Sequence, residues 1–271
     1  MVDVRLIVDP PLPGPWNMGV DEALLLDAVE NGSATLRFYQ WSEPTLSLGY
    51  FQRYADREQH AASRDCKVVR RQTGGGAILH DRELTYSLTL PANHPLTRNT
   101  GKLYSTVHNE FIAALSAAER SSSVESTLRI RGDETPPQST VEPFLCFQRQ
   151  SAGDVILIGG TDKLSTDITP LPSRQIPWKV LGSAQRRHRG AILQHGSLLI
   201  DASPAAPELP GLQNLGGPFL PIKTLIEAVF RRLAAALDFR LNPAHLSAEL
   251  QSKAADLTNN KYGSPAWTNR R

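Results

Sequence analysis

The chain has 271 residues, of which 40% are hydrophobic and 21% are charged, the proportions of a soluble globular protein. Its formal charge of +2 is too small to indicate a nucleic-acid-binding protein. It contains no apolar run of the roughly 18 residues that a bilayer-spanning helix needs, and its N-terminus lacks a signal-peptide pattern, so we expect a cytoplasmic location. Two cysteines, Cys66 and Cys146, are too few for a disulfide framework.

The N-terminal part of the chain alternates helical and strand patterns. An amphipathic helix is predicted over 17–29, where Asn31-Gly32 gives the stop signal. Strand patterns follow at 35–41 and 45–49, joined by a turn at Ser42-Glu43-Pro44. The polar stretch 56–64 predicts a short helix, and 67–71 a further strand.

A triple glycine follows a pair of arginines directly after that strand. Gly74, Gly75 and Gly76 bury no side chain and are costly to order, which indicates a loop whose backbone approaches another group closely. Unhindered amides can face a carbonyl or phosphate oxygen, and we expect Arg70 and Arg71 to add positive charge beside them. A tight hairpin with spare glycines is the alternative. The strand pattern at 84–90 completes the predicted N-terminal sheet.

The middle of the chain mixes one clear helix with short strands and loops. The helix at 102–119 places its apolar residues on one stripe. Strands are predicted at 128–131 and 154–159, and an exposed loop at 135–140. The stretch 160–177 is rich in glycine, proline and small polar residues and is interpreted as a mobile insertion.

The C-terminal part begins with a predicted antiparallel strand pair at 178–185 and 190–201. Two helices are expected at 222–237 and 243–255, with a frayed tail from Asn259. No internal repeat or clear linker divides the chain. We therefore predict one α+β domain over 1–271, with a core at about 17–201 and C-terminal helices at about 222–255.

Three side chains are candidates for chemistry. Cys146 lies between Phe144 and Phe147 in a predicted loop, either as a buried small hydrophobic residue or as a nucleophile, which requires a nearby cation or aligned amides. Lys179 opens a strand and could supply that cation, or it could be a solvated edge residue. His80 could be catalytic or a hydrogen-bonded core or loop histidine, whereas Cys66 is interpreted as structural. Together they suggest acyl transfer, without identifying the acyl group.

Seven blocks along the chain resemble the successive signatures of the lipoate-protein ligase and octanoyltransferase family, in the biotin/lipoate protein ligase catalytic-domain superfamily. The resemblance implies an α+β fold with mixed and antiparallel sheets flanked by helices. The blocks occur in family order at Asn17-Met18-Gly19-Val20-Asp21-Glu22-Ala23, 36–41, 44–52, Arg70-Arg71-Gln72-Thr73-Gly74-Gly75-Gly76 with His80-Asp81, 84–87, Lys179-Val180-Leu181-Gly182-Ser183-Ala184-Gln185-Arg186 and 192–198.

Within this family, ligases activate lipoate with ATP, whereas transferases carry an octanoyl group on a cysteine. The Cys-Phe context of Cys146 resembles LipM-type octanoyltransferases, which implies catalytic roles for Cys146 and Lys179 and no need for ATP or a metal. The departure is the length of 160–177, between the cysteine and lysine blocks. The residues implied to bind substrate are Arg71, Gly74, Gly75, Gly76, His80, Gly182, Ser183, Ala184 and Gln185.

The resemblance also implies protein partners. The expected donor is octanoyl-acyl carrier protein, and the expected acceptor is a lysine of a lipoyl carrier domain, such as glycine cleavage H protein or an E2 subunit. The basic cluster Arg186-Arg187-His188-Arg189 either faces an acidic carrier or is a solvated turn. Three other functions stay open: an ATP-dependent lipoate-protein ligase, octanoyl transfer between lipoyl domains, and a non-catalytic acyl-binding homologue.

Overall fold

The computed structural model describes residues 1–117, 126–133, 142–159, 177–218 and 220–271, and its largest element is an eight-stranded mixed sheet. The strand order is β11-β1-β2-β6-β10-β9-β8-β7. β1 pairs in parallel with β11 and β2, and the other neighbours are antiparallel. The strands are β1 (Val2–Val8), β2 (Ala34–Tyr39), β6 (Glu83–Leu90), β7 (Ser126–Ile130), β8 (Val155–Gly159), β9 (Trp178–His188), β10 (Ala191–Leu199) and β11 (Phe239–Pro243).

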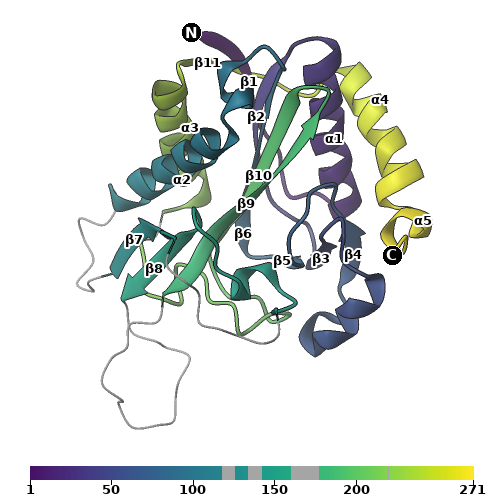
Figure 1. Ribbon diagram of the computed structural model, residues 1–271, viewed down its shortest axis with the longest axis vertical. Helices are drawn as coiled ribbons and strands as arrows, with labels where there is room; N and C mark the ends of the chain where they lie inside the picture. Colours follow the sequence, from purple (N-terminus) through teal and green to yellow (C-terminus); the bar gives the residue numbers. More distant parts are fainter. Residues whose placement is uncertain (118–125, 134–141, 160–176, 219) are drawn as a thin grey trace.

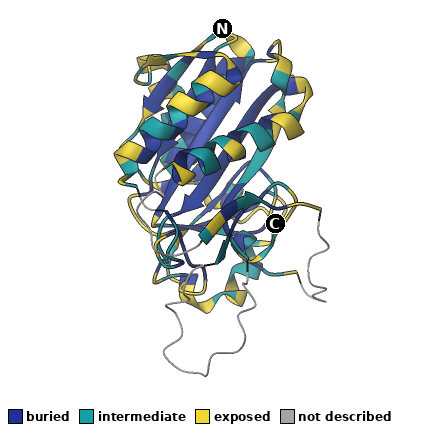
Figure 2. Ribbon diagram, turned by 90° about the vertical axis from the view of Figure 1, so that its left-hand side faces the viewer, coloured by how far each residue is buried: buried dark blue, intermediate teal, exposed yellow. Residues whose placement is uncertain are grey.

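Helices cover both faces of this sheet (Figure 1). α2 (Thr100–Ser116) and α3 (Ile222–Leu237) pack together on one face, and α1 (Gly14–Glu30) and α4 (Ala248–Leu257) pack together on the other. The central strands are consequently dark blue, or buried, between yellow and teal helices in Figure 2. Every residue of β2, β6 and β10 is buried, as expected for strands covered on two sides.

Successive side chains of β2 point to opposite faces of the sheet. Leu36 and Phe38 join the apolar core formed with α2 and α3. Arg37 and Tyr39 point to the opposite face, where both reach Asp21 of α1. This is the two-residue period of a strand, with polar groups tolerated on the second face because they are paired there.

A second, three-stranded sheet carries the glycine-rich segment. Its order is β4-β3-β5, with β3 (Thr45–Leu48) parallel to β4 (Lys67–Arg70) and antiparallel to β5 (Ile78–His80). The loop with the three glycines connects β4 to β5. Leu46, Leu48 and Leu79 anchor this sheet in a separate apolar cluster with Phe144 and Phe147.

Most predicted elements are confirmed, and so is the α+β class with mixed and antiparallel sheets. The helix predicted at 222–237 has the observed bounds of α3, and the predicted pair at 178–185 and 190–201 is the antiparallel pair β9–β10. The stretch 56–64 forms two 3₁₀ helices, Tyr54–Gln59 and Ala61–Ser63, instead of one helix.

Both ends of the chain differ from the prediction. Neither β1 nor β11 was predicted, and β11 adds to the edge of the sheet beside β1. The last helix, expected from Pro243, begins at Ala248 because Pro243 ends β11. The tail from Asn259 is not frayed: the Tyr262 side chain is 1% exposed and its hydroxyl donates to Glu22 at 2.7 Å. The tail continues as α5 (Pro265–Thr268) and packs near β4. Distant partners fix it, and a local sequence pattern does not reveal them.

Two predicted segments, the loop at 135–140 and all but the last residue of the insertion at 160–177, lie outside the described residues. Within the described part of the chain, no helix combines the length and apolarity required for a transmembrane segment.

Candidate functional site

Cys146 begins a short 3₁₀ helix, Cys146–Gln148, beside the glycine-rich loop. The backbones of the two segments are hydrogen-bonded, because Ala77 N–H donates to the Phe144 carbonyl at 3.0 Å and Cys146 N–H donates to the Ala77 carbonyl at 2.7 Å. Phe144 and Phe147 are buried, whereas the cysteine side chain is only half-buried and lines a cavity. Its neighbours therefore anchor the turn and leave the thiol accessible.

Lys179 lies on the other side of this thiol. Its Nζ atom is 3.7 Å from the Cys146 Sγ atom and 2.9 Å from an Asp154 carboxylate oxygen. The lysine is 6% exposed and Asp154 is 2% exposed, so the ion pair is buried. The absence of a side chain at Gly182 leaves space for the lysine, because a Cβ atom there would lie 2.4 Å from Lys179 Cε. The predicted pairing of Cys146 with Lys179 is thus present in space.

Asp154 is a site residue that the sequence analysis missed. It precedes β8 and was interpreted only as the start of a strand. Its carboxylate accepts hydrogen bonds from the Ser151 N–H at 2.8 Å and from the Tyr104 hydroxyl at 3.1 Å. Three partners, including Lys179, satisfy this buried charge. A carboxylate at the edge of an apolar strand is the signal that could have identified it, because such a group requires a partner when buried.

Arg71 shapes the glycine-rich loop from within. Its guanidinium donates to the carbonyls of Ser47 at 2.8 Å and of Gly74 and Gly76 at 2.7 Å each, and burial lowers its pKa to about 10. Gly75 has a φ of +95°, and its carbonyl oxygen would lie 2.0 Å from a Cβ at Gly49. The triple glycine is therefore a closely packed loop folded around an arginine, and the alternative of a hairpin with spare glycines is wrong.

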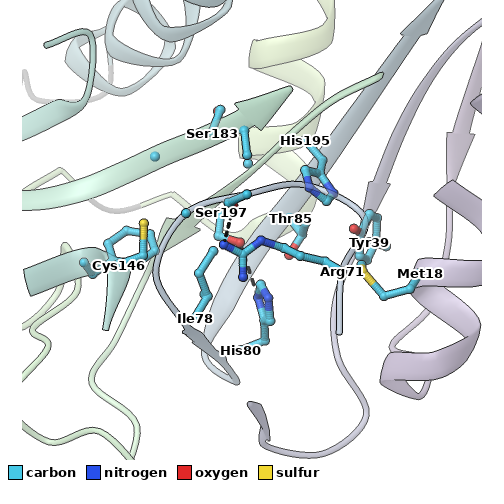
Figure 3. A pocket seen from close by; sticks show the side chains of 16 residues that line it. Met18, Tyr39, Arg71, Ile78, His80, Thr85, Cys146, Ser183, His195 and Ser197 are labelled. Atoms are coloured by element: carbon cyan, nitrogen blue, oxygen red, sulfur yellow. Dashed lines mark hydrogen bonds between the residues drawn. The ribbon is translucent and has the colours of Figure 1, made fainter. Parts of the chain in front are cut away.

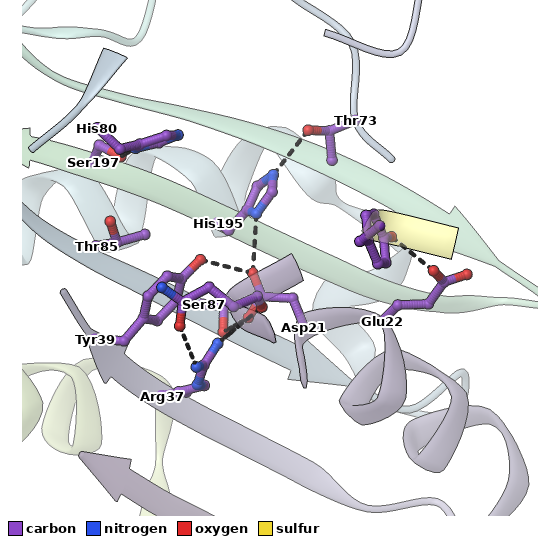
Figure 4. Close-up of polar contacts among 12 residues, drawn as sticks. Asp21, Glu22, Arg37, Tyr39, Thr73, His80, Thr85, Ser87, His195 and Ser197 are labelled. Carbon is purple, nitrogen blue, oxygen red and sulfur yellow. Dashed lines mark hydrogen bonds and ion pairs between the residues drawn. The ribbon is translucent and has the colours of Figure 1, made fainter. Parts of the chain in front are cut away.

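A buried polar network holds the start of this loop (Figure 4). Thr73 Oγ1 lies 2.8 Å from His195 Nε2, and His195 Nδ1 lies 3.1 Å from Asp21. Burial alone would raise the pKa of the Asp21 carboxyl, but the hydrogen bond with His195 and the charge of Arg37 outweigh it, so the pKa is lowered. Asp21 is therefore an ionised anchor that links α1 through the histidine to the loop.

His80 lies in the cavity wall, braced on two sides. Its ring stacks on Trp41 with 3.9 Å between ring centroids, and Nδ1 lies 2.7 Å from Glu83. Burial lowers its pKa. His80 ends strand β5 and is buried, so it has the contacts of the hydrogen-bonded core histidine that the sequence left as one alternative.

Ser183 belongs to a second buried chain of hydrogen bonds. The His108 ring donates from Nδ1 to the Gly153 carbonyl at 2.7 Å, and burial lowers its pKa to about 4, so the ring is neutral at physiological pH. His108 Nε2 then accepts from the Ser183 hydroxyl at 2.6 Å, and Ser183 accepts in turn from Tyr86 at 2.7 Å. Both sides of the serine hydroxyl are occupied by protein groups.

These residues enclose one elongated cavity (Figure 3). Cys146 and Met18 lie at opposite ends of it, with Ile78, Arg71 and His195 between them. Many lining residues are polar by type, but the Tyr39, Thr85 and Ser197 hydroxyls all donate to buried carboxylates. The wall therefore presents mostly carbon to a ligand. Its residues are Met18, Tyr39, Arg71, Gly74, Gly75, Ile78, His80, Thr85, Cys146, Phe147, Gly182, Ser183, Ala184, His195, Gly196 and Ser197.

The sequence-predicted residues are largely brought together, with one exception. Arg71, Gly74, Gly75, His80, Gly182, Ser183 and Ala184 line the cavity with Cys146. Gly76 adjoins it, since its carbonyl binds Arg71. Gln185 instead donates its amide to the Thr100 carbonyl at 2.9 Å and to Gln194 at 2.7 Å. Met18, Thr73, Asp154 and His195 were not predicted as site residues.

Comparison with known proteins identifies relatives over nearly the whole chain. Residues 13–208 match the family model of the lipoyl protein ligase A/B catalytic domain. Octanoyltransferase LipM of Kyrpidia tusciae is 32% identical over 94% of this chain and 94% of its own. Octanoyltransferase LipM of Geobacillus kaustophilus is 29% identical over 96% of this chain and 95% of its own.

Solved structures share the fold at lower identity. A putative lipoate protein ligase from T. acidophilum has a TM-score of 0.71 at 19% identity, covering 100% of both chains. Lipoate-protein ligase A bound with ATP has a TM-score of 0.67 at 18% identity, covering 99% of both chains. These likenesses establish that the arrangement of sheets and helices described above is that of lipoate-protein ligases.

Proposed function

The chain belongs to the lipoyl protein ligase A/B catalytic-domain family, and we propose that it transfers octanoyl groups in protein lipoylation through a thioester on Cys146. The observation that carries this proposal is the 3.7 Å contact between Cys146 Sγ and Lys179 Nζ at one end of a mostly apolar cavity. Relatives named octanoyltransferase over almost the full chain support the same reaction.

In the first half-reaction, the Cys146 sulfur attacks the carbonyl carbon of octanoyl-acyl carrier protein. The new carbon–sulfur bond forms on Cys146 and the bond to the pantetheine sulfur breaks, so the carrier leaves as a thiol with the proton that Cys146 lost. The charge of Lys179 stabilises the attacking sulfur, because a thiolate is the nucleophile and a nearby cation favours it. One thioester replaces another, so no ATP is consumed.

In the second half-reaction, the amine of a lysine on a lipoyl carrier domain attacks the acyl-enzyme. A carbon–nitrogen bond forms, the bond to Cys146 breaks, and the proton from the amine returns the cysteine to its thiol. Amide formation from a thioester is downhill, which drives the sequence forward. A T. acidophilum lipoate protein ligase studied with its E2 lipoyl domain shares this fold at a TM-score of 0.68, and we assign this chain the same class of acceptor.

The cavity supplies binding energy for the alkyl chain. Burial of about seven methylenes at ~0.8 kcal/mol each yields several kcal/mol before the costs of association are subtracted. Those methylenes meet side chains whose polar atoms already have partners, such as Tyr39 with Asp21 and Ser183 with His108. Among the described residues of the wall, the exception is Arg71, whose Nε is buried without a hydrogen-bond partner.

The experiment that tests this function supplies two donors separately. Octanoyl-acyl carrier protein without ATP should octanoylate a lipoyl domain, and Cys146→Ala should abolish the product. Free octanoate with ATP should give neither product nor pyrophosphate. Pyrophosphate release with full activity in Cys146→Ala would identify an ATP-dependent ligase instead, and octanoate binding without turnover of any donor would identify a non-catalytic protein.

A further inference from the structure

Three arginines from two distant parts of the chain gather around one half-buried tyrosine. The Tyr50 ring centroid lies 4.3 Å from the Cζ atom of Arg270, 5.7 Å from that of Arg186 and 5.9 Å from that of Arg271. Arg270 also donates to the Tyr50 hydroxyl at 3.0 Å. We call Tyr50, Phe51, Arg186, Arg270 and Arg271 the arginine patch.

The patch concentrates positive charge. Within the described ranges, none of its arginines forms an ion pair with a carboxylate. Beneath it lies Arg70, which is fully buried and donates to carbonyl groups, including that of Thr268 at 2.8 Å. Burial lowers the pKa of Arg70, and the charges of Arg270 and Arg271 lower it further. Like charges are thus held together against their repulsion in a chain whose net charge is only +2.

The patch also carries an exposed aromatic residue beside the glycine-rich loop. Phe51 is 67% exposed, and the Arg271 guanidinium lies 5.3 Å from its ring centroid. A Cβ atom at Gly74, which lines the cavity, would lie 3.8 Å from Phe51 Cδ2. The Tyr50 N–H donates to the Thr73 carbonyl at 2.9 Å, so the patch is attached to the outside of the glycine-rich loop. Arginine and aromatic side chains together are typical of the binding centre of a protein interface.

The expected basic cluster at 186–189 differs from this arrangement. Arg187 is exposed and donates to the Thr97 carbonyl, whereas Arg186 faces Tyr50. The arginine patch is therefore built from one residue of that cluster and two from the C-terminal segment. In Figure 1 the C-terminus lies beside β4, next to the small sheet that bears the glycine-rich loop.

We propose that the arginine patch docks the acidic surface of the carrier protein that delivers the acyl thioester. This inference rests on the proposed function, because it assigns the donor a place from which its acyl arm can enter beside the glycine-rich loop. The complementarity is electrostatic, so it acts chiefly on the rate and strength of encounter and leaves the chemistry on Cys146 unchanged.

Three donors test the proposal: octanoyl-acyl carrier protein, octanoyl-4′-phosphopantetheine and octanoyl-pantetheine. We expect Arg186→Glu and Arg270→Glu each to raise KM for the protein-borne donor about tenfold with kcat unchanged, and to leave both small donors unaffected. The matched control is Arg231→Glu, which reverses an exposed charge on α3. Arg186→Gln and Arg270→Gln should give smaller changes of the same sign, and rising salt should remove the difference from wild type.

The contrary results distinguish a failure of the docking proposal from a failure of the proposed function. An equal rise in KM for octanoyl-4′-phosphopantetheine would show that the patch binds the phosphate group of the donor and not a protein surface. That result would overturn the proposal. A KM change for the lipoyl domain, with none for the donor, would assign the patch to the acceptor and overturn it too. Failure of octanoyl-acyl carrier protein itself to acylate the wild-type thiol would instead refute the proposed function.

Discussion

The carboxylate of Asp154 lies 2.9 Å from the Lys179 Nζ atom in a pair that is buried on both sides. The same Nζ atom is the cation nearest to the Cys146 sulfur, at 3.7 Å, among the described contacts of that thiol. The carboxylate thus fixes the position and charge of the lysine, and the lysine in turn acts on the nucleophile. A residue that does not contact the sulfur is expected to control its reactivity.

Replacement of Asp154 by asparagine tests this relationship. The variant leaves Lys179 buried without a counter-charge, which should cost about 3–5 kcal/mol of unfolding free energy and lower kcat/KM about 10²-fold. The alkylation rate of Cys146 by iodoacetamide should fall with it over neutral pH. If a folded Asp154→Asn protein had the wild-type alkylation rate and kcat/KM, Lys179 would not need the carboxylate to act on the thiol.

Gly182 should tolerate no side chain, because a Cβ there would lie 2.4 Å from Lys179 Cε and 2.7 Å from Nζ. We expect Gly182→Ala to displace the ammonium group and lower acyl-enzyme formation about 10²-fold, measured by rapid-quench mass spectrometry. Gly101→Ala is the control, since its nearest non-local atom, Asn99 Oδ1, is 4.0 Å from the new Cβ. Equal activity of the two variants would refute the steric account.

Met18, at the far end of the cavity from Cys146, should set the longest acyl chain accepted. Met18→Ala opens room for about two methylenes, each worth ~0.8 kcal/mol, so decanoyl transfer should gain about 15-fold relative to octanoyl. The ratio of kcat/KM values for the two donors measures this. Leu25→Ala, on the same helix but in the cluster with Leu193, should destabilise the protein without changing the ratio. An unchanged ratio in Met18→Ala would place the chain elsewhere.

His108 should make stability depend on pH. Its pKa is lowered to about 4 in the folded protein, against about 6.5 in the unfolded chain, so the unfolded state binds more protons between these values. The neutral His108 ring therefore contributes about 2 kcal/mol of unfolding free energy at pH 7 that is lost as pH falls to 5. Urea unfolding at both pH values should show that His108→Gln lacks this share of the wild-type loss. Equal pH dependence in the two proteins would contradict a neutral, buried ring.

The sequence predicts the site where its chemistry is carried by residue type. The triple glycine, Cys146 and Lys179 stand out in combination, because a loop of unhindered amides, a thiol and a cation together suggest acyl transfer although each alone has a structural alternative. Arg71 was predicted as a site residue and lines the cavity, but its contacts with three carbonyls could not be foreseen, since they depend on the fold of the loop.

Elements that depend on distant partners were harder to predict. The role of Asp154 depends on the pairing of β8 with β9, which brings its carboxylate to Lys179. The C-terminal segment has no amphipathic period of its own, yet Arg70 donates two hydrogen bonds to the Thr268 carbonyl and Glu22 accepts from Lys261 and Tyr262. Its contribution of Arg270 and Arg271 to the arginine patch is equally invisible to local patterns.

The most direct measurement is the intact mass of the protein after brief exposure to octanoyl-acyl carrier protein without acceptor. We predict one octanoyl adduct on wild type and on Cys66→Ala, mapped to Cys146, removed by hydroxylamine and transferred when a lipoyl domain is added. An adduct that persists in Cys146→Ala, or product formation by that variant at the wild-type rate, would contradict a covalent relay through this thiol.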